Sequence, residues 1–190
     1  MPVNTLRPLR AHQLRESARS DPYRSQSKPG GRVLCPVCGA ISLKGRWVPA
    51  TRKSIRSLPD GELKRTACPA CLQKKQRFAQ GVVELRGESW KENRDQVERT
   101  ISNSEKIARS RNDQERVLWT GGSRGIMKVY VSLPELARRI GRELEKSFHG
   151  EAEYVHSTEE PYLRVRWWSD GVPEKAESHR SRAFRGRGRS

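Results

Sequence analysis

Apolar positions follow a regular pattern only in the second half of the chain, from Gly81 onward. Short apolar runs bounded by Gly and polar residues indicate β-strands. Five such runs are present, at 82–85, 116–119, 126–131, 152–156 and 162–168. The Gly-rich residues between the second and third runs predict a β-hairpin.

Two helices are predicted between these strands. The first covers 90–109, where one apolar stripe is formed by Trp90, Val97, Ile101 and Ala108. The second has clearer boundaries: Ser132 and Glu135 match a capping box, Pro134 falls in the first turn, and Gly150 follows the end. Its apolar residues repeat every four positions with basic residues facing outward: Leu136, Ile140 and Leu144 against Arg138, Arg139 and Arg142. The element order predicts an α+β fold with helices on one face of an antiparallel or mixed sheet.

The two ends of the chain lack such a pattern. We expect a disordered basic arm at 1–31 and a disordered Arg/Gly tail at 171–190, because neither segment has enough apolar residues to bury. Between them we expect a zinc ribbon at 32–80 and a small β-α-β-β-α-β-β domain at 81–170.

The overall composition favours a polyanionic partner. The 190 residues include 39 Lys and Arg against 22 Asp and Glu, which gives a net charge of +17, and the mean hydropathy is −0.90. A charge excess of this size is typical of nucleic-acid-binding proteins. We expect no membrane association, because no apolar run reaches spanning length and no strongly amphipathic basic helix is evident. The sequence contains no export or oligomerisation signal, and we expect a cytoplasmic location.

The four cysteines form two Cys-Pro-x-Cys pairs, Cys35 with Cys38 and Cys68 with Cys71. Gly39 follows the first pair and permits the positive φ that points backbone amides at sulfur. Two such pairs placed face to face supply the tetrahedral Cys₄ shell that Zn²⁺ prefers, so we predict one structural zinc ion. The alternatives are a redox dithiol and structural disulfides. A redox dithiol needs only one pair at a helix start, and disulfides need an oxidising compartment, so zinc is favoured.

Basic residues, with aromatic residues near them, are the candidate nucleic-acid contacts. They lie between the cysteine pairs, in the Gly-rich hairpin, on the second helix, on the last strand and in the tail: Lys44, Arg46, Arg52, Lys53, Arg56, Arg124, Arg138, Arg139, Arg142, Arg164, Arg166, Trp168, Arg185, Arg187 and Arg189. Trp47 is expected to cover the metal site, with base stacking as the alternative. Trp168 stacks on a ligand if its sheet face is open and is ordinary packing if both faces are covered.

No catalytic constellation is evident in the sequence. The four histidines, His12, His149, His156 and His179, lack metal-ligand spacing, and no pocket signal accompanies the acidic pair at 159–160. Residues 122–125 read Gly-Ser-Arg-Gly, like the loop of a KH domain, but they join two predicted strands rather than two helices. We therefore expect a protein that is not an enzyme and has no small-molecule substrate.

Several stretches together resemble one known family. They are the two cysteine pairs, the Val-Val-Glu-Leu-Arg-Gly run at 82–87, and the Leu-Ala-Arg-Arg-Ile-Gly-Arg-Glu-Leu run at 136–144 followed by Phe148-His149-Gly150. The pattern is similar to the large-ribosomal-subunit export adaptor family and its short archaeal and bacterial relatives. The similarity covers about residues 33–168, and this chain has one set of four cysteines where longer members carry more. The resemblance implies that the cysteines bind metal and that the ribbon and the following α+β region bind the large ribosomal subunit.

The leading expectation is a non-enzymatic zinc-ribbon RNA-binding protein that associates with the ribosome or with large-subunit rRNA. The Arg-Gly tail and the aromatic–arginine strand favour RNA. The main alternative is a zinc-ribbon DNA-binding or transcription-associated adaptor, although no recognition helix or dimerisation heptad is evident. A third possibility is an enzyme accessory subunit whose ribbon docks protein.

Overall fold

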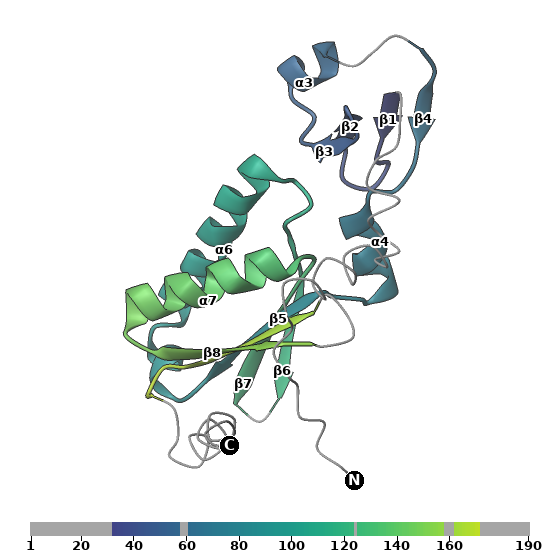
Figure 1. The fold of residues 1–190 in the computed structure, drawn as a ribbon. Coiled ribbons are helices and arrows are strands. Elements are labelled where there is room, and N and C mark those ends of the chain that lie inside the picture. The colour runs from purple at the N-terminus through teal and green to yellow at the C-terminus, as the bar shows by residue number, and fades with distance from the viewer. Residues whose placement is uncertain (1–31, 58–60, 124, 158–161, 172–190) are drawn as a thin grey trace, which may run out of the picture.

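The computed structural model describes four segments of the chain: residues 32–57, 61–123, 125–157 and 162–171. These segments form two sheets and five helices, which confirms the predicted mixed α+β class. Figure 1 shows that the two sheets belong to two neighbouring parts of the molecule, with α4 (Pro69–Gln76) between them.

The N-terminal part, residues 32–57 and 61–80, is called the Cys module below. It holds a four-stranded sheet in the order β3-β2-β1-β4, in which β1 is antiparallel to β2 and parallel to β4. Its elements before α4 are β1 (Arg32–Leu34), β2 (Ile41–Leu43), β3 (Arg46–Val48), α3 (Arg52–Arg56) and β4 (Leu63–Arg65). Each strand has only three residues, so a small buried cluster must hold the module together: Val33, Cys35, Ala40, Trp47, Cys68 and Ala70.

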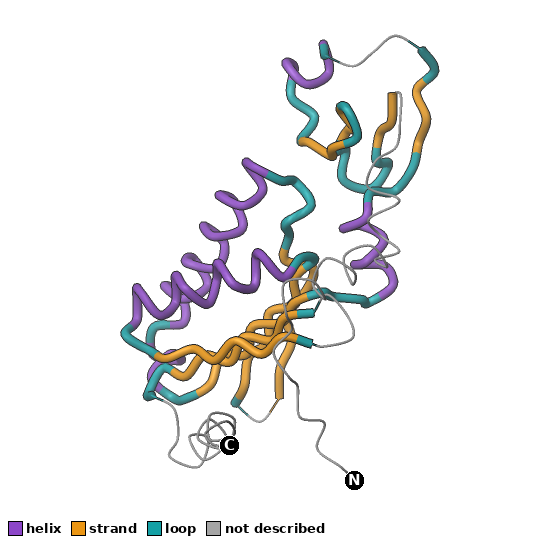
Figure 2. Tube along the Cα trace, viewed as in Figure 1, coloured by secondary structure: helices purple, strands orange, loops and turns teal. Residues whose placement is uncertain are grey.

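Residues 81–123, 125–157 and 162–171 form the second part, called the α+β domain. Its elements are β5 (Gly81–Arg86), α5 (Ser89–Glu92), α6 (Arg94–Arg111), β6 (Val117–Ser123), β7 (Ile126–Val131), α7 (Pro134–Phe148), β8 (Glu151–His156) and β9 (Leu163–Trp168). The strand order is β6-β7-β5-β9-β8, with β5 and β9 parallel and the other neighbours antiparallel. Figures 1 and 2 show α6 and α7 on one face of this sheet.

The core of the α+β domain lies between these helices and the sheet. The predicted apolar stripes of both helices are buried in it, as are the alternate residues Leu163, Val165 and Trp167 of the last strand. Two glycines allow backbone and core side chains to approach closely in this region. A Cβ on Gly141 would lie only 2.8 Å from Val165 Cγ1, and a Cβ on Gly150 would overlap the Trp167 ring.

Three local features differ from the sequence prediction. The helix predicted over 90–109 is divided at Asn93 into α5 and α6. Strand β6 continues to Ser123, so most of the Gly-rich link belongs to the strand rather than to the turn. The capping box at the start of α7 is wrong, because the N-cap is Leu133 and no side chain caps it.

Ser132 makes tertiary hydrogen bonds in place of that cap. Its Oγ accepts from the backbone amide of Arg116 at 2.8 Å and donates to the carbonyl of Gln114 at 2.5 Å. These bonds fasten the start of α7 to the loop before β6. A serine hydroxyl that is used across the fold in this way cannot also cap its own helix.

Candidate metal centre and cationic surfaces

The four cysteines converge at one point of the Cys module. Their Sγ atoms all lie within 4.8 Å of one another, and Cys38 Sγ is 3.7 Å from Cys68 Sγ. Four sulfurs around a tetrahedral Zn²⁺ at about 2.3 Å stand about 3.8 Å apart. All four cysteines are free thiols rather than disulfides. The arrangement therefore fits a single four-coordinate metal ion better than it fits two disulfides.

Local backbone geometry brings the pairs together. The first pair forms a tight turn between β1 and β2. Gly39 in this turn has a φ of +74°, the positive value expected from the sequence, and its backbone amide donates to the Cys35 carbonyl at 3.0 Å. The second pair starts a helix: Cys68 is the N-cap of α4 and Pro69 takes the first helical position.

Hydrogen bonds and burial shift the pKa values of the individual thiols in different directions. Burial raises the pKa of Cys68 to about 11 and also raises that of Cys71. Burial also acts to raise the pKa of Cys35, but backbone amides directed at its sulfur have the larger effect and lower the pKa to about 7. The strongest of these is the amide of Cys68, whose nitrogen is 3.3 Å from Cys35 Sγ. Amide N–H groups directed at sulfur stabilise the thiolate, which is the form that binds a metal.

A buried ion pair from the α+β domain lies beside the cysteine cluster. The Asp113 side chain is 1% exposed and accepts from the guanidinium groups of both Arg109 (3.0 Å) and Arg116. Burial would lower the pKa of Arg116, but the charge of Asp113 and the nearby sulfur of Cys38 raise it above its usual range. Sequence patterns did not reveal this pair, because a polar loop residue gives no periodic signal.

Buried hydrogen bonds also join the two parts of the molecule. The backbone amide of Ala70 donates to Gln114 Oε1 at 3.1 Å, and Gln73 Nε2 donates to the carbonyl of Ser132 at 3.1 Å. The helix that begins at the second cysteine pair is thus docked directly on the α+β domain. Arg46 adds an exposed hydrogen bond to the Arg111 carbonyl at 2.9 Å.

The predicted basic residues between the cysteine pairs are all exposed. Three of them, Arg52, Lys53 and Arg56, lie on α3, whose capping box joins Thr51 and Ser54. Within the described segments, no Lys or Arg of the Cys module forms an ion pair with an acidic side chain. Trp47 is only 3% exposed, so it packs in the module core and does not offer a stacking face.

Charge is divided unequally between the two parts. Residues 32–80 contain eleven Lys and Arg against two Asp and Glu, whereas residues 81–171 contain sixteen of each. The net charge of +17 therefore comes from the Cys module and from the two terminal segments. The α+β domain is neutral as a whole.

The predicted basic face of α7 is balanced by acids on the same helix. Arg142 is exposed, Arg139 is half-buried, and Arg138 Nη2 lies 3.2 Å from His156 Nε2. Burial and, next, the charge of Arg138 lower the pKa of His156. Three glutamates flank these arginines along α7: Glu135 precedes them, and Glu143 and Glu145 follow them.

The predicted cluster on the last strand is organised around one buried acid that the sequence analysis missed. Glu84, whose side chain is 3% exposed, lies within 4.0 Å of one cation on its own strand and three on the two neighbouring strands: Arg86, and Lys128, Arg164 and Arg166. Burial raises the pKa of Glu84, but the hydrogen bond and charge of Arg86 and the other cations lower it overall. Trp168 is 7% exposed, with the Arg86 guanidinium 5.8 Å from its ring centroid, so its role here is packing.

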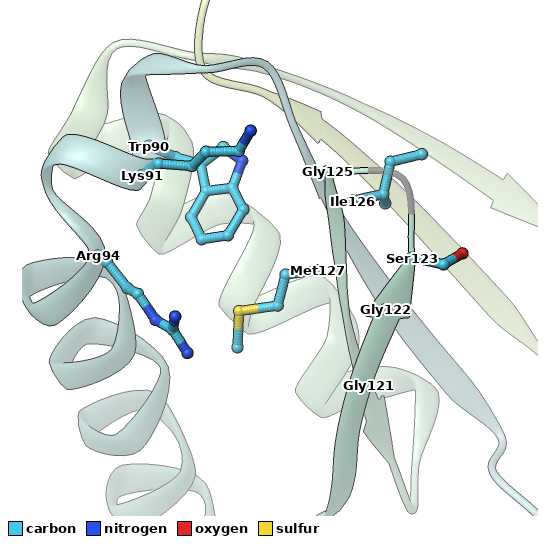
Figure 3. Close-up of a pocket in the computed structure, with 9 residues that line it drawn as sticks. All are labelled: Trp90, Lys91, Arg94, Gly121, Gly122, Ser123, Gly125, Ile126 and Met127. Atoms are coloured by element: carbon cyan, nitrogen blue, oxygen red, sulfur yellow. The ribbon is translucent and has the colours of Figure 1, made fainter.

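Figure 3 shows a shallow hollow of about 470 Å³ between the start of α6 and the β6–β7 hairpin. Trp90 and Met127 line its floor, and Lys91 and Arg94 lie at its rim. Its lining residues include no His, Cys, Asp or Glu.

Four predicted contact residues, Arg124, Arg185, Arg187 and Arg189, lie outside the described segments, as do Glu159 and Glu160. No helix of the described segments combines the length and apolarity needed to cross a membrane. No known protein family matches the chain. No curated protein sequence matches it either.

Proposed function

We propose that this protein is a non-enzymatic RNA-binding protein whose Cys module is held by one structural Zn²⁺ ion and makes the main contact with RNA. The observation that carries the proposal is the charge division. The module has a net charge of +9 from eleven cations and two acids. Ten of the eleven cations are exposed, and within the described segments none of the eleven forms an ion pair with an acidic side chain. A folded protein gains nothing in stability from such a surface, because like charges repel, so a polyanion is the natural partner.

Zinc is the metal that the donor set favours. Four thiolate sulfurs at tetrahedral spacing suit Zn²⁺, and hard cations such as Mg²⁺ prefer oxygen ligands. Four protein ligands leave no open position for water or substrate, so the ion is assigned a structural role. Its contribution is to hold the basic surface in one shape.

The ribosome or large-subunit rRNA is the proposed target. Basic residues are spread over α3, β4 and α4 and over both terminal segments, which suits a large irregular polyanion better than a single groove. Several weak contacts on one chain give a high overall affinity when one target can engage all of them at once. The resemblance of the cysteine pairs and α7 to the export adaptor family supports the same target. A DNA-binding adaptor is the alternative.

The main test compares two triple variants of equal charge change. In one, the three α3 cations Arg52, Lys53 and Arg56 become Gln; in the matched control, the three α7 cations Arg138, Arg139 and Arg142 become Gln. RNA affinity is measured against salt concentration. The α3 variant should lose up to about 2 from the slope of log K against log salt, at about 0.7 per phosphate contact, and the α7 variant should lose less. Equal or reversed effects would show that the Cys module is not the main contact.

A second experiment tests the target. Cell extract is sedimented at near-physiological salt, with and without prior nuclease treatment. Co-migration with large subunits that disappears at high salt supports the ribosomal assignment. Protein that remains at the top of the gradient, or moves with chromosomal DNA, contradicts it and favours the DNA-binding adaptor.

A further inference from the structure

We propose that Trp119, Tyr130 and Arg77 form a platform on which an unpaired RNA base stacks. The inference rests on the proposed RNA-binding function and adds the place where a base, rather than a phosphate, is held. None of these three residues was among the candidates from the sequence.

The platform joins two strands and a helix end. Trp119 lies on the edge strand β6 and pairs with Tyr130 on β7. Their ring centroids are 4.9 Å apart and the ring planes meet at 21°, so the rings are stacked. The Arg77 guanidinium lies 5.2 Å from the Trp119 centroid, and Arg77 itself ends α4 in the left-handed conformation, with a φ of +55°.

The rings lie outside both core clusters. Trp119 and Tyr130 are partly exposed and belong to neither the Cys-module cluster nor the core of the α+β domain. Tyr130 is paired with Val82, whereas the next residue, Val83, and Leu85 on the same face as Val83 belong to the core beneath the helices. Because side chains alternate along a strand, the aromatic pair faces away from α6 and α7.

The surroundings of the platform leave room for a ligand. Gly121 lies two residues beyond Trp119 on the same face of β6, and a Cβ added there would meet no atom within 4 Å. Glycine weakens a strand interior, and neither a positive φ nor close packing requires it here. Lys128, the strand partner of Gly121, pairs with Glu84 at 3.4 Å and keeps a side chain 34% exposed, so it adds positive charge beside the platform.

The platform also continues the basic surface of the Cys module. Lys74 and Lys75 are exposed on α4, one turn before Arg77. An RNA strand held by those cations would pass Arg77 and meet the aromatic pair next. Aromatic rings beside cations are the usual means by which proteins hold single-stranded nucleic acid, since every base has a π-face.

The test uses two probes of equal length and charge: a single-stranded oligouridine RNA and an oligomer of the same backbone without bases. Affinity for each is measured with wild type, Trp119→Leu and Tyr130→Leu, and with Tyr130→Phe as the control that keeps the ring. Loss of a stacked base weakens binding by about 5- to 150-fold. We expect a loss in that range for RNA with either Leu variant, unchanged affinity for the abasic probe, and no loss with Phe.

The abasic probe also serves as the folding control, because its binding depends on the charged surface alone. Equal losses for both probes in the Leu variants would overturn the platform, as would a wild type that binds both probes equally tightly. In either case the RNA-binding proposal still stands. A wild type that binds neither probe at low salt overturns the proposed function and the platform together.

Discussion

Loss of the metal should unfold the Cys module and leave the α+β domain folded. The perturbation is a Cys68→Ser variant, or removal of metal from wild type with a chelator under reducing conditions. Cys68 Sγ is fully buried, lies 3.7 Å from Cys38 Sγ and belongs to the module's only buried cluster within the described segments. The core of the α+β domain contains no cysteine.

The magnitudes support this separation. The largest fully buried apolar side chains of the module are Val33, Ile41 and Trp47. At about 1.5–3 kcal/mol each they contribute less than about 9 kcal/mol, whereas a structural Zn²⁺ ion contributes about 10–16 kcal/mol. The domain would lose the two buried hydrogen bonds from Ala70 and Gln73, each worth about 0.5–1.5 kcal/mol. Its free energy of unfolding should therefore fall by only about 1–3 kcal/mol.

Amide hydrogen exchange followed by mass spectrometry resolves the two parts. Peptides from 32–57 and 61–78 should lose protection in Cys68→Ser, and peptides from 81–123 and 125–157 should keep most of theirs. Val37→Ser is the matched control, because Val37 lies between the cysteines of the first pair but is 71% exposed. Protection of the module without metal would refute the assignment of its stability to the ion, and loss of protection throughout the chain would refute the independence of the two parts.

Three further substitutions test the α+β domain. Gly141→Ala should lower the free energy of unfolding of the domain by about 1–2 kcal/mol, because overpacking against Val165 outweighs a helix-propensity gain of about 1 kcal/mol. Chemical denaturation measures this free energy, and a variant more stable than wild type would contradict the prediction. Glu84→Gln should cost about 1–2 kcal/mol at pH 7, since its cation partners are partly exposed. The pKa of Glu84 is lowered in the folded protein, so the stability that its charge contributes is present above the ordinary carboxyl range and is lost as the pH falls through the lowered pKa. Thermal melts should therefore show the stability difference between Glu84→Gln and wild type shrinking below about pH 4. Asp113→Asn should cost about 3 kcal/mol, because it removes the carboxylate partner of the Arg116 guanidinium, whose side chain is only 12% exposed; a cost under 1 kcal/mol would contradict that role.

The parts of the fold that sequence reasoning predicted are those set by local periodicity. The four-residue repeat of Leu136, Ile140 and Leu144 identified α7 and its buried face, and the two cysteine pairs identified the cluster. Both signals lie within a short stretch of chain. They require no knowledge of which strands are neighbours.

The features that were missed depend on pairing between distant segments. Glu84 meets Lys128 on β7 and Arg166 on β9 only because β5 lies between those two strands. Trp119 and Tyr130 were each visible as strand aromatics, but their contact depends on the register of the hairpin and on a bulge after Val117. Local patterns could not supply the strand order or that register.

The proposed metal centre and the basic surface would solve one physical problem together. A module with eleven cations and few buried apolar side chains would be opposed by its own charge if a hydrophobic core alone had to hold it. Four thiolates that coordinate Zn²⁺ cross-link the chain strongly at one point. The site also has a net charge of −2, from four negative sulfurs and one divalent cation. A negative centre of this kind would account for the position of Arg116, a cation that lies beside Cys38 with a side chain only 12% exposed, in a domain that is neutral as a whole. If the proposed ion rather than an apolar core holds the module, nearly all of its surface is free to carry the positive charge that the proposed RNA binding needs.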